Sequence, residues 1–243
     1  MEFDELLSLM QTRRTIRAIK TDPIPDEDVQ KILEAARWAP TGFNMQPNQF
    51  VVVKDEALRT EIKWVVDDYK NSDFYPMEAT REEWQGHPWT MATHGAFDLP
   101  LAPVFVVFCG DTRRRVGLPM AARYSRQKGD SIFESSLSNA FMFAWLAAHS
   151  LGYAVCPISA VKYPKLQGLV KHILNLPDYI WVYDILMIGK SEMDPGSKLT
   201  RPLSEMVHYE RVKDGEFMDE ETLRKQIKKL RAGNVARHGE AGQ

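Results

Sequence analysis

Arg13-Arg14-Thr15-Ile16-Arg17 opens the informative part of this sequence, and Ala39-Pro40-Thr41-Gly42-Phe43-Asn44-Met45-Gln46-Pro47 follows it. The first stretch concentrates fixed positive charge beside a hydroxyl group, and the second is a turn that carries carboxamides. Guanidinium groups donate forked hydrogen bonds of the geometry that a phosphate accepts. Carboxamides both donate and accept, which suits the edge of a heteroaromatic ring. Together the two stretches predict a nucleotide-like cofactor that is held at both ends.

Each stretch alone also has a plainer interpretation. Arginines at a helix end are usually a solvated charged face, and an asparagine in a loop often serves only as a turn former. Two further observations favour the cofactor. Arg201 adds a guanidinium near the other end of the chain, and four carboxamides gather directly before a predicted strand, at Asn44, Gln46, Asn48 and Gln49.

Composition excludes several classes of protein. The chain has 243 residues, 44% of them hydrophobic and 26% charged, which is ordinary globular composition. A formal net charge of -2 lacks the basic excess of a nucleic-acid-binding protein. The most apolar helical stretch, residues 137–151, is shorter than the ~20 residues that cross a bilayer. Acidic residues stand at the N-terminus, where a signal peptide carries positive charge. We therefore expect a cytoplasmic protein that binds neither nucleic acid nor membrane.

Hydrophobic periodicity and helix signals predict the secondary structure. Helices are expected over residues 3–10, 26–39, 58–69, 132–150, 164–174 and 219–232, and strands over 50–53, 103–109, 153–157 and 181–188. The strand at 103–109 is continuously apolar, so we expect it to be central in its sheet. The helix at 132–150 is apolar nearly all round, which is typical of a core helix, and Gly152 suits the left-handed position after it. Cys109 and Cys156 lie in apolar runs and are expected to be small core residues.

The last predicted helix lies in a C-terminal extension, residues 211–243. Asp219 is expected to cap it, with Glu220 and Glu221 in its first turn, and Gly233 is expected to end it.

Taken together, the two opening stretches resemble the FMN-dependent nitroreductase family. Its pattern is Arg-Arg-(Ser/Thr)-x-Arg near the N-terminus, then a helix ending Ala-x-x-Ala-Pro-(Ser/Thr)-x-x-Asn-x-Gln-Pro, and Ala36 to Pro47 fits the second part. The likeness extends in the same order over about residues 1 to 210. The further matching stretches are Ser138-Asn139 with Ala147 to Gly152, Val155 to Ala160, Ile188-Gly189-Lys190, and Arg201 to Val207 with Tyr209-Glu210.

The resemblance implies a fold and a division of the chain. The fold class is α+β: a nitroreductase-like fold with a mixed, mainly antiparallel sheet flanked by helices, in an intertwined homodimer. Residues 1–210 are expected to form the FMN-binding domain. Residues 70–131 are longer than in the short reductases, and we expect them to form a lid or insert over the flavin.

The resemblance also assigns cofactor-binding roles residue by residue. The flavin N5 atom accepts the hydride, so a fixed backbone N–H donor beside it tunes the reduced cofactor; no acid–base side chain is evident. Family members build each FMN site across the subunit interface, and the turn loop is expected to come from the second subunit. The residues assigned to the phosphate and ribityl chain are Arg13, Arg14, Thr15 and Arg17, with Arg201 and Lys198 from the C-terminal segment. The residues assigned to the turn loop are Thr41, Gly42, Asn44 and Gln46. The residues assigned to the flavin ring are Asn139 and the N5 turn, which consists of Pro157, Ile158, Ser159 and Ala160.

Substrate contacts are expected in the lid segment. Its aromatic residues Trp84, Trp89, Phe97 and Tyr124 would stack on a flat substrate, and Arg126 would donate to a nitro or carbonyl oxygen. The alternative is that these aromatic residues pack beneath a long loop or against the partner subunit.

The function implied is an enzyme, an FMN-dependent oxidoreductase. NADH or NADPH would reduce the flavin, and a small nitroaromatic or quinone would then take the electrons in a ping-pong cycle. No Gly-x-Gly-x-x-Gly motif is present, which agrees with a nicotinamide that visits the flavin instead of occupying its own Rossmann site. The alternatives are a reductive dehalogenase or ene-reductase of the same family, and a flavin-binding sensor or storage protein with little turnover.

Overall fold

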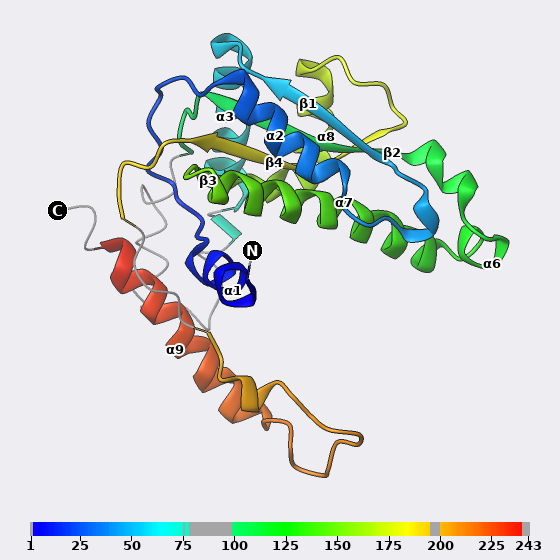
Figure 1. Ribbon diagram of the computed structural model, residues 1–243, viewed down its shortest axis with the longest axis vertical. Helices are drawn as coiled ribbons and strands as arrows, with labels where there is room; N and C mark the ends of the chain where they lie inside the picture. Colours follow the sequence, from blue (N-terminus) through cyan, green and yellow to red (C-terminus); the bar gives the residue numbers. More distant parts are fainter. Residues whose placement is uncertain (1, 75, 78–98, 195–199, 240–243) are drawn as a thin grey trace. The chain divides into compact units, whose positions relative to one another are not determined.

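A four-stranded antiparallel sheet in the order β1-β2-β4-β3 forms the centre of the protein (Figure 1). Its strands are β1 (Asn48–Val53), β2 (Val104–Asp111), β3 (Ala154–Pro157) and β4 (Ile180–Gly189). The computed structural model describes residues 2–74, 76–77, 99–194 and 200–239. The chain divides into one unit of Met1–Asn71 and Leu99–Pro195, which contains the sheet, and a second of Ser72–Asp98 and Gly196–Gln243.

Strand β2 is central, as its continuous apolar sequence predicts, because it pairs with β1 on one side and β4 on the other. Every residue of β2 is buried. A parallel bridge from Thr15 to Val155 extends the sheet beyond β3. The sheet is therefore mixed and mainly antiparallel, and the predicted α+β class is confirmed.

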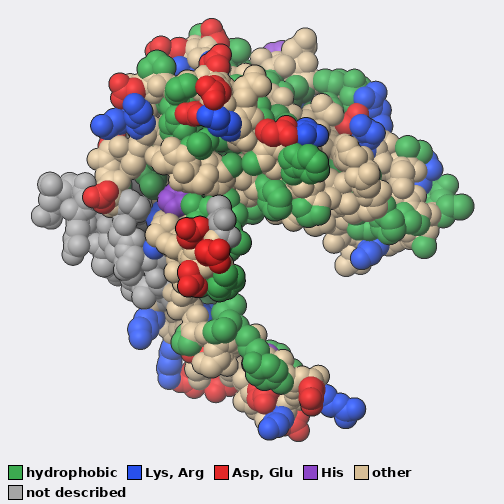
Figure 2. All heavy atoms as spheres, viewed as in Figure 1, with side chains coloured by type: hydrophobic (Ala, Val, Ile, Leu, Met, Phe, Trp, Pro, Cys, Tyr) green, Lys and Arg blue, Asp and Glu red, His purple; other side chains and the backbone are tan. Residues whose placement is uncertain are grey.

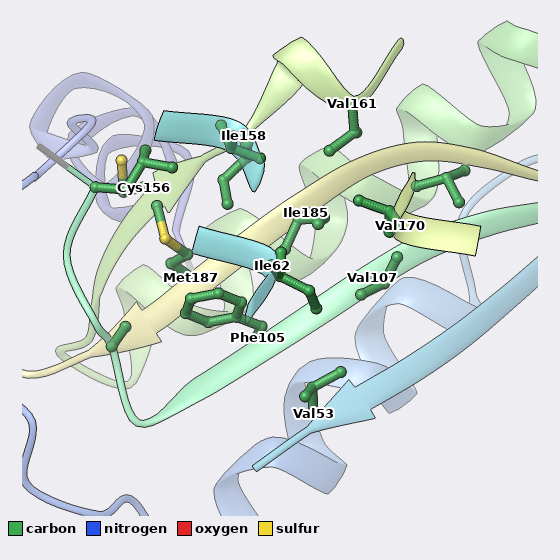
Figure 3. Close-up of a cluster of buried hydrophobic side chains, with 14 of the residues drawn as sticks. Val53, Ile62, Phe105, Val107, Cys156, Ile158, Val161, Val170, Ile185 and Met187 are labelled. Carbon is green, nitrogen blue, oxygen red and sulfur yellow. The ribbon is translucent and has the colours of Figure 1, made fainter. Parts of the chain in front are cut away.

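Helices cover both faces of the sheet (Figure 1). Helices α3 (Glu56–Tyr69) and α8 (Pro164–Ile173) pack on one face, where Ile62, Leu166 and Val170 join a core with Val107 and Met187 (Figure 3). Helices α2 (Asp26–Arg37) and α7 (Arg126–Ser150) pack on the other face. This burial on both faces explains why β2 and β4 are apolar throughout most of their length instead of alternating.

Helix α7 is longer than the sequence indicated, because it begins at Arg126 with Ser125 as its cap and not near residue 132. Its first turn is polar, so periodicity gave no sign of it. It ends at Ser150, and Gly152 follows with a φ of 82°, as predicted. The remaining short elements of the first unit are α1 (Phe3–Thr12), η1 (Gly42–Asn44), η4 (Thr112–Gly117), α6 (Met120–Arg123) and η5 (Ser159–Lys162), and η2 (Lys70–Phe74) follows α3.

The described part of the second unit contains η6 (Leu203–Glu205) and α9 (Glu220–Gly239). The predicted cap is confirmed, since Asp219 Oδ1 accepts a hydrogen bond from Thr222 N at 2.7 Å. The predicted end near residue 232 is wrong, because α9 continues through Gly233 to Gly239. A glycine inside a helix costs only about 1 kcal/mol relative to alanine, so Gly233 does not have to end it.

The expected lid, residues 70–131, needs narrower bounds. Residues 104–111 of this stretch form the central strand β2, and 126–131 belong to α7. Both parts belong to the first unit, and β2 is buried throughout. The division of the chain at residue 210 stays a prediction. In the described residues, no helix combines the length and apolar character that a membrane crossing requires. Acidic and basic side chains are interspersed on the face shown in Figure 2.

Candidate functional site

The arginine stretch lies where the end of α1 meets the end of α7. Arg13 is the C-terminal cap of α1, and its guanidinium carbon lies 4.3 Å from the centre of the Trp145 ring. Burial lowers the pKa of Arg13, and the neighbouring charge of Arg14 lowers it further. Arg14 Nη1 donates to the carbonyl of Arg13 at 2.9 Å and to that of Gln11. Positive charge is thus concentrated here, and an anion would relieve its repulsion.

His149, near the end of α7, belongs to the same cluster and was missed by sequence reasoning. Thr12 Oγ1 lies 2.9 Å from His149 Nε2 and 2.8 Å from the carbonyl oxygen of Ser8. If the Thr12 hydroxyl donates to that carbonyl, the Nε2–H tautomer of His149 can donate to Thr12. Burial, then the charges of Arg13 and Arg14, lower the pKa of His149.

The expected N5 turn lies at the other end of the same neighbourhood. Thr15 pairs with Val155 in a parallel bridge, and Ile16 N donates to Val155 O at 3.0 Å. Because the two segments run in the same direction, Arg17 is carried toward the exit of β3. Its charge acts on Cys156, where burial raises the thiol pKa to about 11 and Arg17 opposes that rise.

The turn itself is held by its apolar neighbours. Ile158 is 2% exposed and Val161 is buried completely, and both side chains enter the core (Figure 3). Ser159 and Ala160 between them begin the short helix η5. Helix starts leave N–H groups without helical acceptors, and in the described residues the N–H groups of Ser159 and Ala160 donate to no backbone carbonyl. Two donors are therefore free for a ligand.

Asp184, also missed by sequence reasoning, lies beneath this turn. It is 2% exposed, and its Oδ2 accepts a hydrogen bond from Ser159 Oγ at 2.6 Å. Lys162 Nζ lies 3.6 Å from the same oxygen. Burial raises the pKa of Asp184, and the Ser159 hydrogen bond and Lys162 charge oppose the rise. The sequence did carry a signal, because Asp184 is the one acidic residue within the apolar strand 180–189.

The turn loop is strained. Phe43, Asn44 and Gln46 have φ of 53°, 51° and 47°, so the loop holds three of the five non-glycine residues with positive φ in the described chain. Such conformations cost about 1–2 kcal/mol each and cluster at binding sites. Gln46 Nε2 donates to Asn44 Oδ1 at 2.8 Å, and Thr41 Oγ1 accepts from Gln46 N at 3.2 Å.

Two contacts fix this loop to the middle of α7. Gly42 N donates to Ser136 Oγ at 3.1 Å, and Asn139 Nδ2 donates to the Pro40 carbonyl at 2.9 Å. A Cβ on Gly42 would meet Ile132 Cγ2 at 2.3 Å, so only glycine permits this approach. The loop and Asn139 therefore form one cluster. Since Ser136 and Asn139 precede His149 by ten or more residues, this cluster lies roughly 15–20 Å along α7 from the arginine cluster.

The remaining predicted residues lie on other elements or outside the described residues. Tyr124 is 74% exposed at the end of α6, and Arg126 is exposed in the first turn of α7, near Asp130. Arg201 lies in the second unit, where its Nη2 donates to the Glu205 carbonyl at 2.9 Å. Four predicted residues lie outside the described residues: Trp84, Trp89, Phe97 and Lys198.

The residues present fit a phosphorylated heteroaromatic cofactor. Guanidinium and hydroxyl groups from Arg13, Arg14 and Thr15 stand at one end, and the free N–H groups of Ser159 and Ala160 stand at the other, joined by the bridge between Thr15 and Val155. Phosphate accepts from guanidinium and hydroxyl donors, and a ring nitrogen accepts from N–H. This donor set is compatible with FMN.

Comparison with known proteins places the chain in a family. Residues 10–190 match the model of the Nitroreductase family, and the chain belongs to that family. It is 26% identical over 214 residues to the FMN reductase [NAD(P)H] of Bacillus subtilis, covering 85% of this chain and 74% of that protein. It is 31% identical over 159 residues to the 5,6-dimethylbenzimidazole synthase of Rhodospirillum rubrum, covering 65% and 70%.

A solved structure supports the fold. The nitroreductase A of Vibrio parahaemolyticus superposes with a TM-score of 0.69 at 18% identity, covering 97% of this chain and 86% of that one. The predicted nitroreductase-like fold is thereby confirmed.

Proposed function

We propose that this protein is an NAD(P)H-dependent FMN oxidoreductase. The observation that carries the proposal is the parallel bridge between Thr15 and Val155, because it joins the arginine cluster to the turn with free N–H groups. Membership in the Nitroreductase family and the likeness to the Bacillus subtilis FMN reductase support the choice of cofactor. When bound, FMN supplies the two-electron exchange between a nicotinamide and an acceptor.

The chain's own residues bind and orient the cofactor. Arg13, Arg14 and Thr15 hold its phosphate, and Arg17 supplies positive charge near the exit of β3. Ser159 and Ala160 present backbone donors at fixed positions, so no reorganisation is needed when charge builds up on the ring. Arg201 and Lys198 are proposed to reach the phosphate from the second unit.

A homodimer is part of the proposal. Helix α1 has no buried residue, although Phe3, Leu6, Leu7 and Met10 repeat at helical spacing and Phe3 is 73% exposed. Such a face is expected to pack against another surface. The loop cluster also lies roughly 15–20 Å along α7 from the arginine cluster. A two-fold dimer would bring the loop of one subunit to the arginines of its partner.

The substrate class follows from the family and the lid segment. A small flat acceptor, such as a nitroaromatic or a quinone, would take electrons after the nicotinamide product leaves, in a ping-pong cycle. The second candidate is an FMN-dependent reductive dehalogenase or ene-reductase, and the likeness to proteins of other names, such as the 5,6-dimethylbenzimidazole synthase, fits a reaction other than nitro reduction. The Trp84, Trp89, Phe97, Tyr124 and Arg126 contacts stay part of the proposal.

The test begins with purified protein and added FMN. Tight binding measured by quenching of flavin fluorescence, followed by anaerobic bleaching with NADH or NADPH, is expected. Nitroaromatics, quinones, enones and halophenols are then offered as re-oxidants, and parallel initial-rate lines indicate a ping-pong cycle. Protein that binds FMN but is not reduced by either nicotinamide would instead be a flavin store, and protein that binds no FMN would overturn the proposal.

A further inference from the structure

Asp184 is a buried carboxyl group within an apolar strand, and the inference drawn from it rests on the proposed function. An ionised carboxylate is expensive to remove from water unless donors surround it. Asp184 is 2% exposed, between the core residues Val182 and Ile185. The cost of burying the Asp184 carboxylate in this strand therefore needs a physical explanation.

The strand is distorted so that Asp184 can face the N5 turn. In the pairing of β4 with β2, Phe108 faces Asp184 but Cys109 faces Val182, so β4 contains one extra residue at this point. Val182 and Ile185 both join the core on the α3 and α8 side, although residues three apart in a regular strand face opposite sides. Such a bulge re-aims a side chain, and bulges are frequent beside active sites.

The register of β3 with β4 sets the partner of Asp184. Pro157 pairs with Leu186, and Ile158 N donates to Ile185 O at 2.9 Å. The next position in this register brings Ser159 opposite Asp184, where the hydroxyl donates to the carboxylate at 2.6 Å. This cross-strand pair therefore ties the first residue of the turn to β4.

The groups around Asp184 suit its ionised form. Ser159 Oγ donates to Oδ2, Ile185 N donates to Oδ1 at 2.9 Å, and Lys162 Nζ lies 3.6 Å from Oδ2. The Ile185 N–H and the Lys162 ammonium can only donate, and the Lys162 charge favours the carboxylate over the neutral carboxyl group. Lys162 is held in turn by the bulge, since its Nζ lies 4.0 Å from the centre of the Tyr183 ring.

We propose that Asp184 is the positioning residue of the Ser159–Ala160 turn, and that its negative charge opposes electron uptake by flavin bound there. Its carboxylate fixes the Ser159 hydroxyl and Lys162, which keeps the N–H groups of Ser159 and Ala160 in place. The turn is thereby both an orienting device and a means of setting the reduction potential of the cofactor.

The experiment compares Asp184→Asn with Asp178→Asn in the full-length protein with bound FMN. Asparagine can keep the contact with Ser159, because the hydroxyl can reverse and accept from the amide, but it removes the charge. Asp178 is a matched control, since it is exposed and lies just before the same strand. The readouts are the midpoint potential of bound FMN, measured anaerobically against reference dyes, and the FMN dissociation constant.

We expect Asp184→Asn to shift the potential to a more positive value while FMN affinity stays within about threefold, and Asp178→Asn to leave both unchanged. Ser159→Ala, a change at an exposed position, is expected to weaken FMN binding about tenfold, because it frees the turn from the carboxylate. Ser159→Ala also tests the positioning role of Asp184 if the Asp184→Asn protein does not fold.

The inference is overturned if Asp184→Asn has the same potential as the control, or if Ser159→Ala binds FMN as the wild type does. These outcomes leave the proposed function intact, since the wild-type protein would still bind FMN and accept electrons from NAD(P)H. A wild-type protein that binds no FMN overturns the proposed function itself.

Discussion

Replacing Arg13 with alanine tests whether Arg13 binds the FMN phosphate or only stabilises the fold. Without ligand, the guanidinium gains a contact with Trp145 at 4.3 Å, worth about 0.5–1 kcal/mol in a partly exposed setting. Burial and the charge of Arg14 oppose that gain. We therefore expect Arg13→Ala to change the unfolding free energy of the apoprotein by less than about 1 kcal/mol.

The effect on FMN binding should be larger. A hydrogen bond to a charged group contributes about 1.5–3 kcal/mol, so the FMN dissociation constant should rise roughly 10- to 150-fold. With FMN at about a thousand times the wild-type dissociation constant, binding stabilises the fold by ~4.1 kcal/mol, and a hundredfold weaker variant keeps only about 1.4 kcal/mol.

Flavin fluorescence quenching measures the affinity, and urea unfolding with and without FMN measures the stability. Arg37→Ala is the control, because Arg37 is an exposed cation paired with Glu34. Arg13→Lys keeps the charge but loses the fork and should fall between the two. An Arg13→Ala protein that binds FMN within twofold of the control would refute the phosphate assignment.

Three further predictions concern the same clusters. His149 has a lowered pKa when folded, so the unfolded chain binds more protons as pH falls below about 6.5, and stability is lost there; His149→Gln should reduce this acid sensitivity in urea unfolding at pH 5 and 8. Gly42→Ala should cost about 1–3 kcal/mol through the clash with Ile132, and Ile132→Ala in the same protein should recover part of that loss in a double-mutant cycle. Burial raises the thiol pKa to about 12 for Cys109 and about 11 for Cys156, so neither should react with a thiol reagent at pH 8 until denaturant is added; rapid reaction in the native protein would contradict their burial.

Most of the fold could be predicted from the sequence, because it rests on local signals. The apolar run at β2, the helical spacing in α2 and the glycine after α7 each depend on neighbouring residues. The errors lie where those signals fade. The first turn of α7, from Arg126, is polar, and Gly233 does not end α9 because one glycine is a weak helix breaker.

Some residues of the candidate site could be selected from the sequence, and others could not. The residues of the N-terminal and β3 stretches carry a motif, so sequence reasoning selected them, although their roles stay predictions. His149 lies in a matching stretch but was given no role, and Asp184 lies outside the matching stretches. The first is placed by the crossing of α1 with α7, and the second by a bulge together with the register of β3 on β4. Contacts of this kind depend on pairing between distant segments, which one sequence does not reveal.

Several features of the candidate site cost folding free energy, and this cost supports the location of the site. A protein of this size is stable by only about 5–15 kcal/mol. Against that margin, the chain maintains three left-handed residues in one loop, a buried carboxylate under one turn and adjacent arginines at one helix end. The loop and the arginines belong to stretches that the family motif selects, and the carboxylate contacts Ser159 in a third such stretch. Because each feature opposes folding, a ligand bound beside them is the physical explanation that we propose for their presence together.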